Sequence, residues 1–204
     1  MRRGFLPCAS GLLKCPATTA GSLSQPEAQG KKPRLLLQDE ARFGRRSRPR
    51  RCWAPVGTRP VRPNGCEREC TCVYGAVSPL DGCFDHRLCA KMNTEAMGEF
   101  LRQVSGKYAG DYILMVVDGA SSHKAKALEV PANIALIALP GYSPQLNPQE
   151  NVWDEIREKN FPNRVYASME AVREQLTAGL EAFANSPASV TSLTAWPWIR
   201  SILS

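Results

Sequence analysis

The pattern of apolar residues changes character near residue 94 of the chain. Before that point, short apolar runs separated by turn residues predict strands. The first run ends in two acids, Asp39 and Glu40, a pattern that suits a buried strand with functional groups at its carboxyl end. The predicted elements of this half are strands at 34–40, 52–57, 70–78 and 83–88, the last of them an edge strand after a hairpin turn at 79–82.

After residue 94 the apolar period becomes helical. Unbroken apolar runs at 112–117 and 134–139 predict interior strands covered on both faces. A helix capped by Thr94 precedes the first run, a short helix is predicted at 122–130, and a last helix begins near Ser168. The residues that these helices are expected to bury are Met97, Phe100, Leu101 and Val104 in the first, and Met169, Val172, Leu176, Leu180 and Phe183 in the last.

The order of these elements predicts an α/β fold. Its mixed sheet has three antiparallel strands followed by two parallel strands, joined by right-handed crossovers and flanked by helices. A length of 204 residues with 43% apolar residues fits one domain with a real core. We expect an irregular leader without a DNA-binding module at 1–33, the domain at 34–184, and a C-terminal tail at 185–204 that packs back through its apolar segment 196–199.

The charge of the chain favours a polyanionic partner. The net charge is +7 and the isoelectric point is near 9.1. Eight arginines and no acid lie between Arg42 and Arg62, where they could neutralise phosphates; a solvated face is the alternative. No apolar stretch approaches the roughly 20 residues of a membrane span. The residues predicted to contact DNA are Arg42, Arg45, Arg46, Arg48, Arg50, Arg51 and Lys124.

The eight cysteines do not predict a zinc site. Their spacing matches no paired zinc pattern, and Cys70 and Cys72 alternate within a predicted strand. Buried free thiols are favoured over disulfides, because no convincing export signal precedes them.

The segment Ser143-Pro144-Gln145-Leu146-Asn147-Pro148-Gln149-Glu150-Asn151-Val152-Trp153 is the most informative part of the sequence. Asn147 is a good N-cap, and Pro148 suits the first helical position. Glu150 then falls in the first turn, with Trp153 one turn further on to anchor the helix. A carboxylate at a helix start suits a metal site, whereas a capping box between Asn147 and Glu150 is the alternative.

Three carboxylates fall where an α/β sheet gathers its functional groups. Asp39 ends the first predicted strand, Asp118 ends the strand after the long helix, and Glu150 opens the helix after the next strand. Alternation points Asp39 and Glu40 to opposite faces, so only one of them is expected to join the cluster. Asp118 before Gly119 has a plain turn as its alternative. Converging carboxylates repel one another unless a cation occupies the site, and hard oxygen ligands select Mg²⁺ or Mn²⁺.

Three blocks of the sequence resemble the acidic blocks of DDE-superfamily transposases, the bacterial insertion-sequence relatives of the mariner elements in particular. The segment at 53–57 and Met92-Asn93-Thr94 fit the same group, and Glu150 follows Asp118 by 32 positions, an interval typical of it. The resemblance covers about 34–184. The three blocks are Gln38-Asp39-Glu40, Val117-Asp118-Gly119-Ala120-Ser121-Ser122-His123 and the segment from Ser143 to Trp153.

The resemblance implies a ribonuclease H-like fold and two Mg²⁺ or Mn²⁺ ions held by Asp39, Asp118 and Glu150 as catalytic residues. It implies that His123 and Asn147 shape the site, although a lone histidine is otherwise a surface or structural residue. The implied chemistry is hydrolysis at the ends of a mobile element, followed by attack of the freed 3′-hydroxyl on target DNA. The implied partners are these DNAs, with a second copy of the chain or an upstream-encoded DNA-binding subunit, in the cytoplasm at the nucleoid.

One departure from the family divides the functional hypotheses. Residues 1–33 are too short and too irregular for the helix-turn-helix modules that family members carry ahead of this domain. The chain is therefore either a metal-dependent DNA endonuclease and strand transferase, or a truncated non-catalytic remnant that binds DNA or a full-length transposase. A nuclease acting on RNA–DNA hybrids is disfavoured, because the block at 147–153 resembles transposases.

Overall fold

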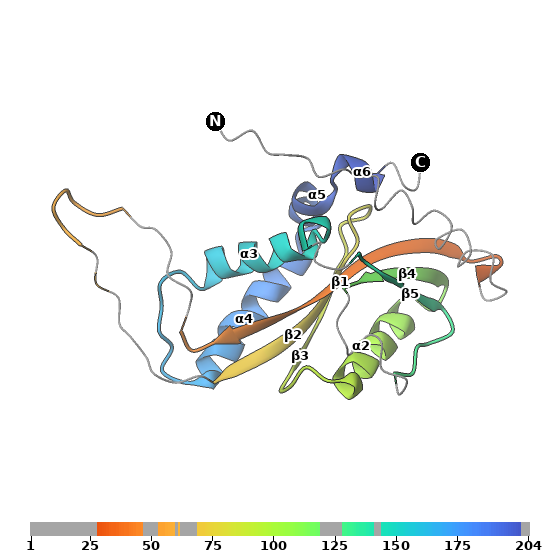
Figure 1. The fold of residues 1–204 in the computed structure, drawn as a ribbon, viewed down its shortest axis with the longest axis horizontal. Helices are drawn as coiled ribbons and strands as arrows, with labels where there is room; N and C mark the ends of the chain where they lie inside the picture. The colour runs from red at the N-terminus through yellow and green to blue at the C-terminus, as the bar shows by residue number, and fades with distance from the viewer. Residues whose placement is uncertain are drawn as a thin grey trace.

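A five-stranded mixed sheet forms the centre of the structure, in the order β3-β2-β1-β4-β5 (Figure 1). The computed structural model describes residues 28–46, 53–59, 61, 69–118, 128–140 and 144–200. β1 pairs with β2 and β2 with β3 antiparallel, whereas β1 with β4 and β4 with β5 are parallel. The predicted mixed sheet is thus confirmed. Its strands are β1 Lys32–Gly44, β2 Cys70–Val77, β3 Phe84–Cys89, β4 Asp111–Val117 and β5 Ile134–Ala138.

β1 changes its set of partners halfway along its length. From Lys32 to Leu37 it pairs with β4, and from Leu37 to Gly44 it pairs with β2. Leu37 is the one residue that the two registers share, opposite Val77 on one side and Val116 on the other. The side of β1 that faces β4 is therefore no longer covered by that strand beyond Leu37.

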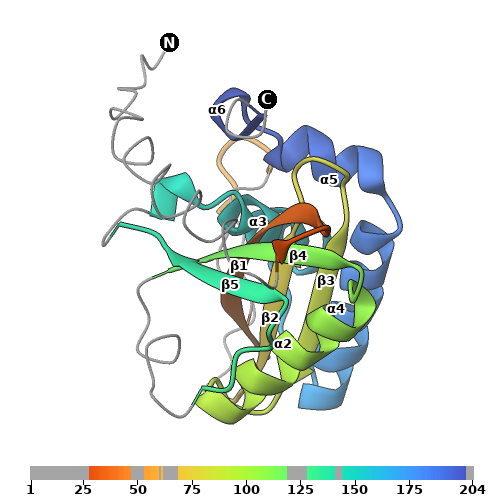
Figure 2. The same ribbon diagram turned by 90° about the vertical axis from the view of Figure 1, so that its right-hand side faces the viewer.

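Helices cover the two faces of the sheet unequally (Figure 2). α2, Thr94–Lys107, packs on one face against a cluster that includes Leu36, Tyr74 and Met115. The other face carries the larger apolar cluster, built around Trp153. The helices of that second face are α3 Gln149–Asn160, α4 Met169–Ala184, α5 Pro187–Thr194 and the short α6 Pro197–Arg200, with a 3-10 turn, η4 Pro144–Leu146, ahead of α3.

The amphipathic periods of the sequence place both long helices correctly. α2 buries Met97, Phe100, Leu101 and Val104 as predicted, but its N-cap is Asn93, whose side chain accepts from the N–H of Ala96. α4 begins directly after Ser168, close to its predicted start, and the side chain of Ser168 caps it by accepting from the N–H of Ala171. Of its expected inner residues, Met169 is only half-buried, whereas Val172, Leu176, Leu180 and Phe183 are buried. Among the described residues, no helix is long and apolar enough to cross a membrane.

Three details of the predicted strands are wrong. β1 runs well past its predicted end, because β2 supplies hydrogen bonds as far as Gly44. The segment at 53–57 is a turn instead of a strand: Thr58 donates to the carbonyl of Pro55, Gly57 has a φ of +83°, and Trp53 is fully exposed. β5 lies at the edge of the described sheet instead of its interior, with two of its five residues buried.

The remaining sequence predictions concern the two ends, the thiols and one helix. Of the predicted leader, residues 1–27 lie outside the described residues, as does most of the helix predicted at 122–130; its last residues, 128–130, are not helical. Beyond residue 184, Val190 and Ile199 are fully buried in the larger core, so the segment 196–199 packs back as predicted. The four described cysteines are free, and their exposure varies: Cys70 is exposed, Cys72 is buried, and Cys83 and Cys89 lie between.

Candidate active site

The change of partner in β1 brings two of the predicted acids side by side. Leu37 pairs with Val116 in the parallel register, and Asp39 and Asp118 each follow two residues later. Asp39 is nearly buried, at 8% exposure, and Asp118 is half-buried. The sequence predicted that Asp39 ends its strand, but β1 continues beyond it to Gly44. The parallel pairing of β1 with β4 ends at Leu37, two residues before Asp39. The edge of β1 next to Asp39 is therefore not covered by β4.

Glu40 joins the same group, against our prediction. One carboxylate oxygen from each of Asp39, Glu40 and Asp118 lies within 4.8 Å of the other two. The alternation of the strand itself holds: Asp39 contacts Trp153 of α3, whereas Glu40 is opposite Tyr74, which belongs to the α2-side core. Because β4 no longer covers this edge of β1, both side chains can bend around it to the same place.

Glu150 approaches from the start of α3. It is exposed, and it lies outside the group of three whose oxygens are within 4.8 Å of one another. Its charge nevertheless acts on Asp39. The start of α3 is one residue later than predicted, with Pro148 as its cap and Gln149 as its first residue.

Asn147 fastens this helix start to β1. Its Oδ1 accepts a hydrogen bond from the backbone N–H of Gln149 at 3.1 Å, and its Nδ2 donates to the carbonyl of Gln38 at 2.9 Å. Asn147 is buried, so both bonds lie away from solvent. Since Gln38 precedes Asp39 and Gln149 precedes Glu150, these bonds link the backbone beside one acid to the backbone beside the other.

The electrostatics of Asp39 are unfavourable to its charge. Burial raises the pKa of Asp39 to about 7, and repulsion from Glu150 and from Glu40 adds to the rise. Hydrogen bonds from the backbone N–H of Glu40 and the indole N–H of Trp153 act in the opposite direction. A cluster of hard carboxylate oxygens with this repulsion fits a divalent cation such as Mg²⁺ or Mn²⁺, which would favour the ionised form.

The predicted basic residues are only partly described. Arg45 donates to the carbonyls of Tyr166 and Ala167 and faces Glu69 at 3.7 Å, so it ties β1 to the segment before α4. Arg42 and Arg46 are exposed. The other residues predicted to contact DNA or to shape the site lie outside the described residues; these are Arg48, Arg50, Arg51, His123 and Lys124.

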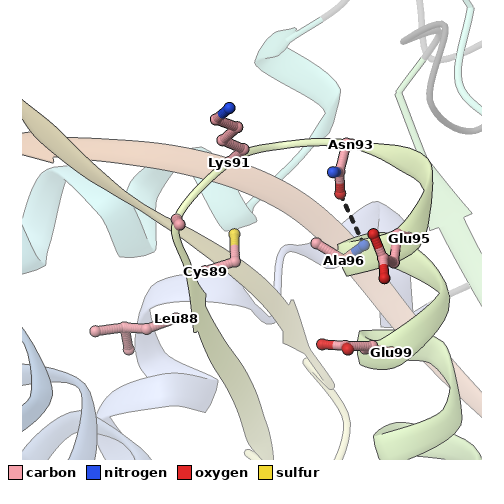
Figure 3. Close-up of a pocket in the computed structure, with 8 residues that line it drawn as sticks. Leu88, Cys89, Lys91, Asn93, Glu95, Ala96 and Glu99 are labelled. Atoms are coloured by element: carbon pink, nitrogen blue, oxygen red, sulfur yellow. Dashed lines mark hydrogen bonds between the residues drawn. The ribbon is translucent and has the colours of Figure 1, made fainter.

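A separate cavity lies between the end of β3 and the start of α2 (Figure 3). Its volume is about 300 Å³, and its lining includes Cys89, Lys91, Asn93 and Glu99. Glu99 is already ion-paired with Arg87. None of the predicted acids of the site lines this cavity, so it is distinct from the acidic edge of β1.

Carboxylates converge where a central strand of the mixed sheet loses its parallel neighbour, an arrangement that suits a metal-dependent enzyme acting on phosphodiesters. The model of the DDE superfamily endonuclease family matches residues 34–173, and the chain belongs to this family. A curated relative, the uncharacterized protein y4pE/y4sA of Sinorhizobium fredii (strain NBRC 101917 / NGR234), is 31% identical over 127 residues. That alignment spans 62% of this chain and 94% of the relative.

Solved structures confirm the ribonuclease H-like fold. The Mos1 mariner paired end complex with Mn matches with a TM-score of 0.58 and 15% identity, over 79% of this chain and 54% of the Mos1 chain. A pre-cleavage Mos1 transpososome matches with a TM-score of 0.60 and 14% identity, over 96% and 65% of the two chains. The chain thus spans between about half and two thirds of the Mos1 chains. At these identities the likeness concerns the fold.

Proposed function

We propose that the chain is the catalytic core of a transposase that cleaves DNA strands and joins the freed 3′-hydroxyl to target DNA. The observation that carries the proposal is the convergence of Asp39, Glu40 and Asp118 at the open edge of β1, in a chain of the DDE endonuclease family. The Mos1 structures include a strand transfer complex and complexes with Mn and with Mg, which support this chemistry by analogy.

The residues have distinct tasks in this proposal. Asp39, Asp118 and Glu150 hold two Mg²⁺ or Mn²⁺ ions, and Asn147 keeps Glu150 at its distance from β1. When bound, such ions activate a water or a 3′-hydroxyl and stabilise the leaving oxygen of the phosphodiester. The carboxylates themselves supply negative charge at the open edge of β1, where strand pairing fixes the backbone that carries Asp39 and Glu40, so that a cation binds there without rearrangement of the sheet. His123 is proposed to shape the site beside them.

The proposed partner is DNA, at the element ends and at the target. The net charge of +7 and the exposed Arg42 and Arg46, which follow Asp39 and Glu40 along the chain, support contacts to phosphates. The remaining predicted contacts, Arg45, Arg48, Arg50, Arg51 and Lys124, stay part of this proposal. Dimerisation on DNA, or assembly with an upstream-encoded DNA-binding subunit, is proposed by analogy with the paired-end complexes of Mos1.

A nicking assay tests the function. Supercoiled plasmid is incubated with the protein and Mg²⁺ or Mn²⁺, and nicked circles are counted for the wild type and for Asp118→Asn. We expect the wild type to nick and the variant to lose at least 100-fold in rate, as is typical when a charge-stabilising group is removed. If both proteins bind DNA and leave it intact, the chain is the non-catalytic remnant instead.

A further inference from the structure

Trp153 contacts the proposed site through its one polar atom. Its indole Nε1 donates a hydrogen bond of 3.0 Å to Oδ2 of Asp39, and both side chains are buried. A buried tryptophan needs an acceptor for its N–H, and a backbone carbonyl or a water would satisfy it. Here the acceptor is a side-chain carboxylate proposed as a metal ligand, so the bond has a consequence beyond satisfying Trp153.

The position of the indole is fixed by the packing around it. Trp153 is fully buried, and its ring meets Phe43 and Phe84 edge-on at centroid distances of 6.4 and 6.2 Å. The packed ring of Trp153 cannot move to keep its Nε1 bonded to Asp39 if the carboxylate rotates. The bond therefore requires the carboxylate of Asp39 to adopt the orientation that faces Nε1.

Gly75 gives the indole access to Asp39. Gly75 is the residue opposite Asp39 in β2. A Cβ at Gly75 would lie 2.5 Å and 2.8 Å from two ring atoms of Trp153, and 2.6 Å from Nε2 of Gln149. The indole thus lies against bare backbone beside its acceptor.

We propose that Trp153 is a positioning residue of the proposed reaction, whose N–H holds Oδ2 of Asp39 so that Oδ1 is the oxygen offered to the metal. This inference rests on the proposed function, and it assigns to Trp153 a task beyond anchoring α3. A carboxylate fixed by a partner outside the metal is oriented before the ion arrives, and loss of such partners typically weakens metal binding by 10- to 100-fold.

Substitution of two tryptophans separates positioning from packing. Trp153→Phe keeps an aromatic ring and removes the N–H. Trp196→Phe is the matched control, because the indole N–H of Trp196 donates to the carbonyl of Leu193, away from the acids. Binding of Mn²⁺ is measured by electron paramagnetic resonance of the free ion, and the fold by circular dichroism and thermal unfolding. We expect Trp153→Phe to bind Mn²⁺ at least 10-fold more weakly than the wild type, and Trp196→Phe to bind it normally.

The outcomes distinguish the two proposals. If the wild type binds Mn²⁺, Asp39→Asn does not, and folded Trp153→Phe binds within twofold of the wild type, the positioning role is wrong and the proposed function stands. If the wild type itself binds no Mn²⁺, the proposed function fails.

A second measurement needs no change at Trp153. The indole N–H of Trp153 is identified in ¹⁵N-tryptophan spectra by elimination with Trp53→Phe, Trp196→Phe and Trp198→Phe. Because this N–H touches the proposed ligand, we expect its resonance to shift during a Mg²⁺ titration while that of Trp196 does not. An indole resonance of Trp153 that stays in place at saturating Mg²⁺ would overturn the inference.

Discussion

Asp39 is a carboxyl group whose surroundings favour its neutral form. Burial and two neighbouring acids raise its pKa to about 7, whereas only two hydrogen bonds favour its charge. A divalent cation would reverse this balance, because it stabilises several carboxylates at once. At the scale of single residues, the metal-free site is thus a strained electrostatic arrangement, and its strain depends on pH.

The contribution of Asp39 to the stability of the metal-free protein should be lost as the pH rises from about 4 to about 7. Asp39 binds its proton more tightly when folded, with a pKa of about 7 against 3.8 for the free group, so its contribution is complete below about pH 4 and is lost through pH 7. In EDTA, we expect Asp39→Asn to melt on the order of 5 °C above the wild type at pH 8 and at a similar temperature at pH 4. Thermal unfolding at several pH values checks this; identical pH profiles would contradict it.

Glu40 should contribute to metal binding alongside Asp39. Its carboxylate oxygen lies within 4.8 Å of those of Asp39 and Asp118, so Glu40→Gln removes charge from the place where a cation would sit. We expect about 10-fold weaker Mn²⁺ binding by calorimetry, in the range seen when a group supporting a metal is removed. Glu174→Gln, on the exposed side of α4, is the control. If Glu40→Gln binds Mn²⁺ with the affinity of the wild type, Glu40 lies beside the site without contributing to metal binding.

Two of the three acids that converge at the edge of β1, Asp39 and Asp118, were singled out by the sequence, but the arrangement of the group was not. Asp39, Asp118 and Glu150 stand out because they follow apolar runs or open a helix. The place of Glu40 was missed, because alternation describes where Cβ atoms point and not how far a glutamate can bend around an uncovered edge. The bond from Trp153 to Asp39 joins residues 114 positions apart, and no local pattern reports it.

At the scale of elements, the sequence predicted the wrong boundary where a partner strand or a capping residue sets the end of an element. β1 continues to Gly44 only because β2 pairs with it that far. The segment at 53–57 has strand-forming residues but no strand beside it among the described residues, and it forms a turn. α3 begins after Pro148, since the side chain of Asn147 bonds to both β1 and the helix start. The long amphipathic helices, by contrast, follow from their own periodicity.

The contact between β2 and α3 should not tolerate a methyl group at Gly75. The Cβ of Gly75→Ala would meet the fully buried ring of Trp153 at 2.5 Å, so the helix must move. We expect a loss of about 1–3 kcal/mol in the free energy of unfolding, measured by urea denaturation. Gly106→Ala in α2, where nothing lies within 4 Å, should instead gain about 0.5–1 kcal/mol. Equal stability of Gly75→Ala and the wild type would contradict the described packing.

At the scale of the whole molecule, the acidic edge lies within a chain that carries a net charge of +7. The acids at the edge of β1 repel DNA locally, so the basic remainder of the surface must supply the attraction. This division of charge suits a protein that brings phosphates to a cation-binding site.

Binding to DNA should weaken steeply with salt. Exposed Arg42 and Arg46 are expected to contact phosphates, so Arg42→Gln and Arg46→Gln should each lower the slope of log K against log [salt] by about 1. Fluorescence anisotropy of a labelled duplex at several salt concentrations measures the slope. Arg173→Gln, on the exposed face of α4, is the control. A slope that neither substitution changes would show that Arg42 and Arg46 do not contact the DNA phosphates.

The shared position of Leu37 also bears on how the molecule folds. Its partner Val77 is 40 residues away, whereas Val116 is 79 residues away and joins only after the crossover through α2. Because closure of longer loops costs more entropy, we expect the antiparallel half to form before the parallel half docks. Asp118 then joins Asp39 and Glu40 only at the final step. A divalent ion should accordingly slow unfolding while leaving the refolding rate nearly unchanged, which stopped-flow measurements with and without Mg²⁺ would reveal.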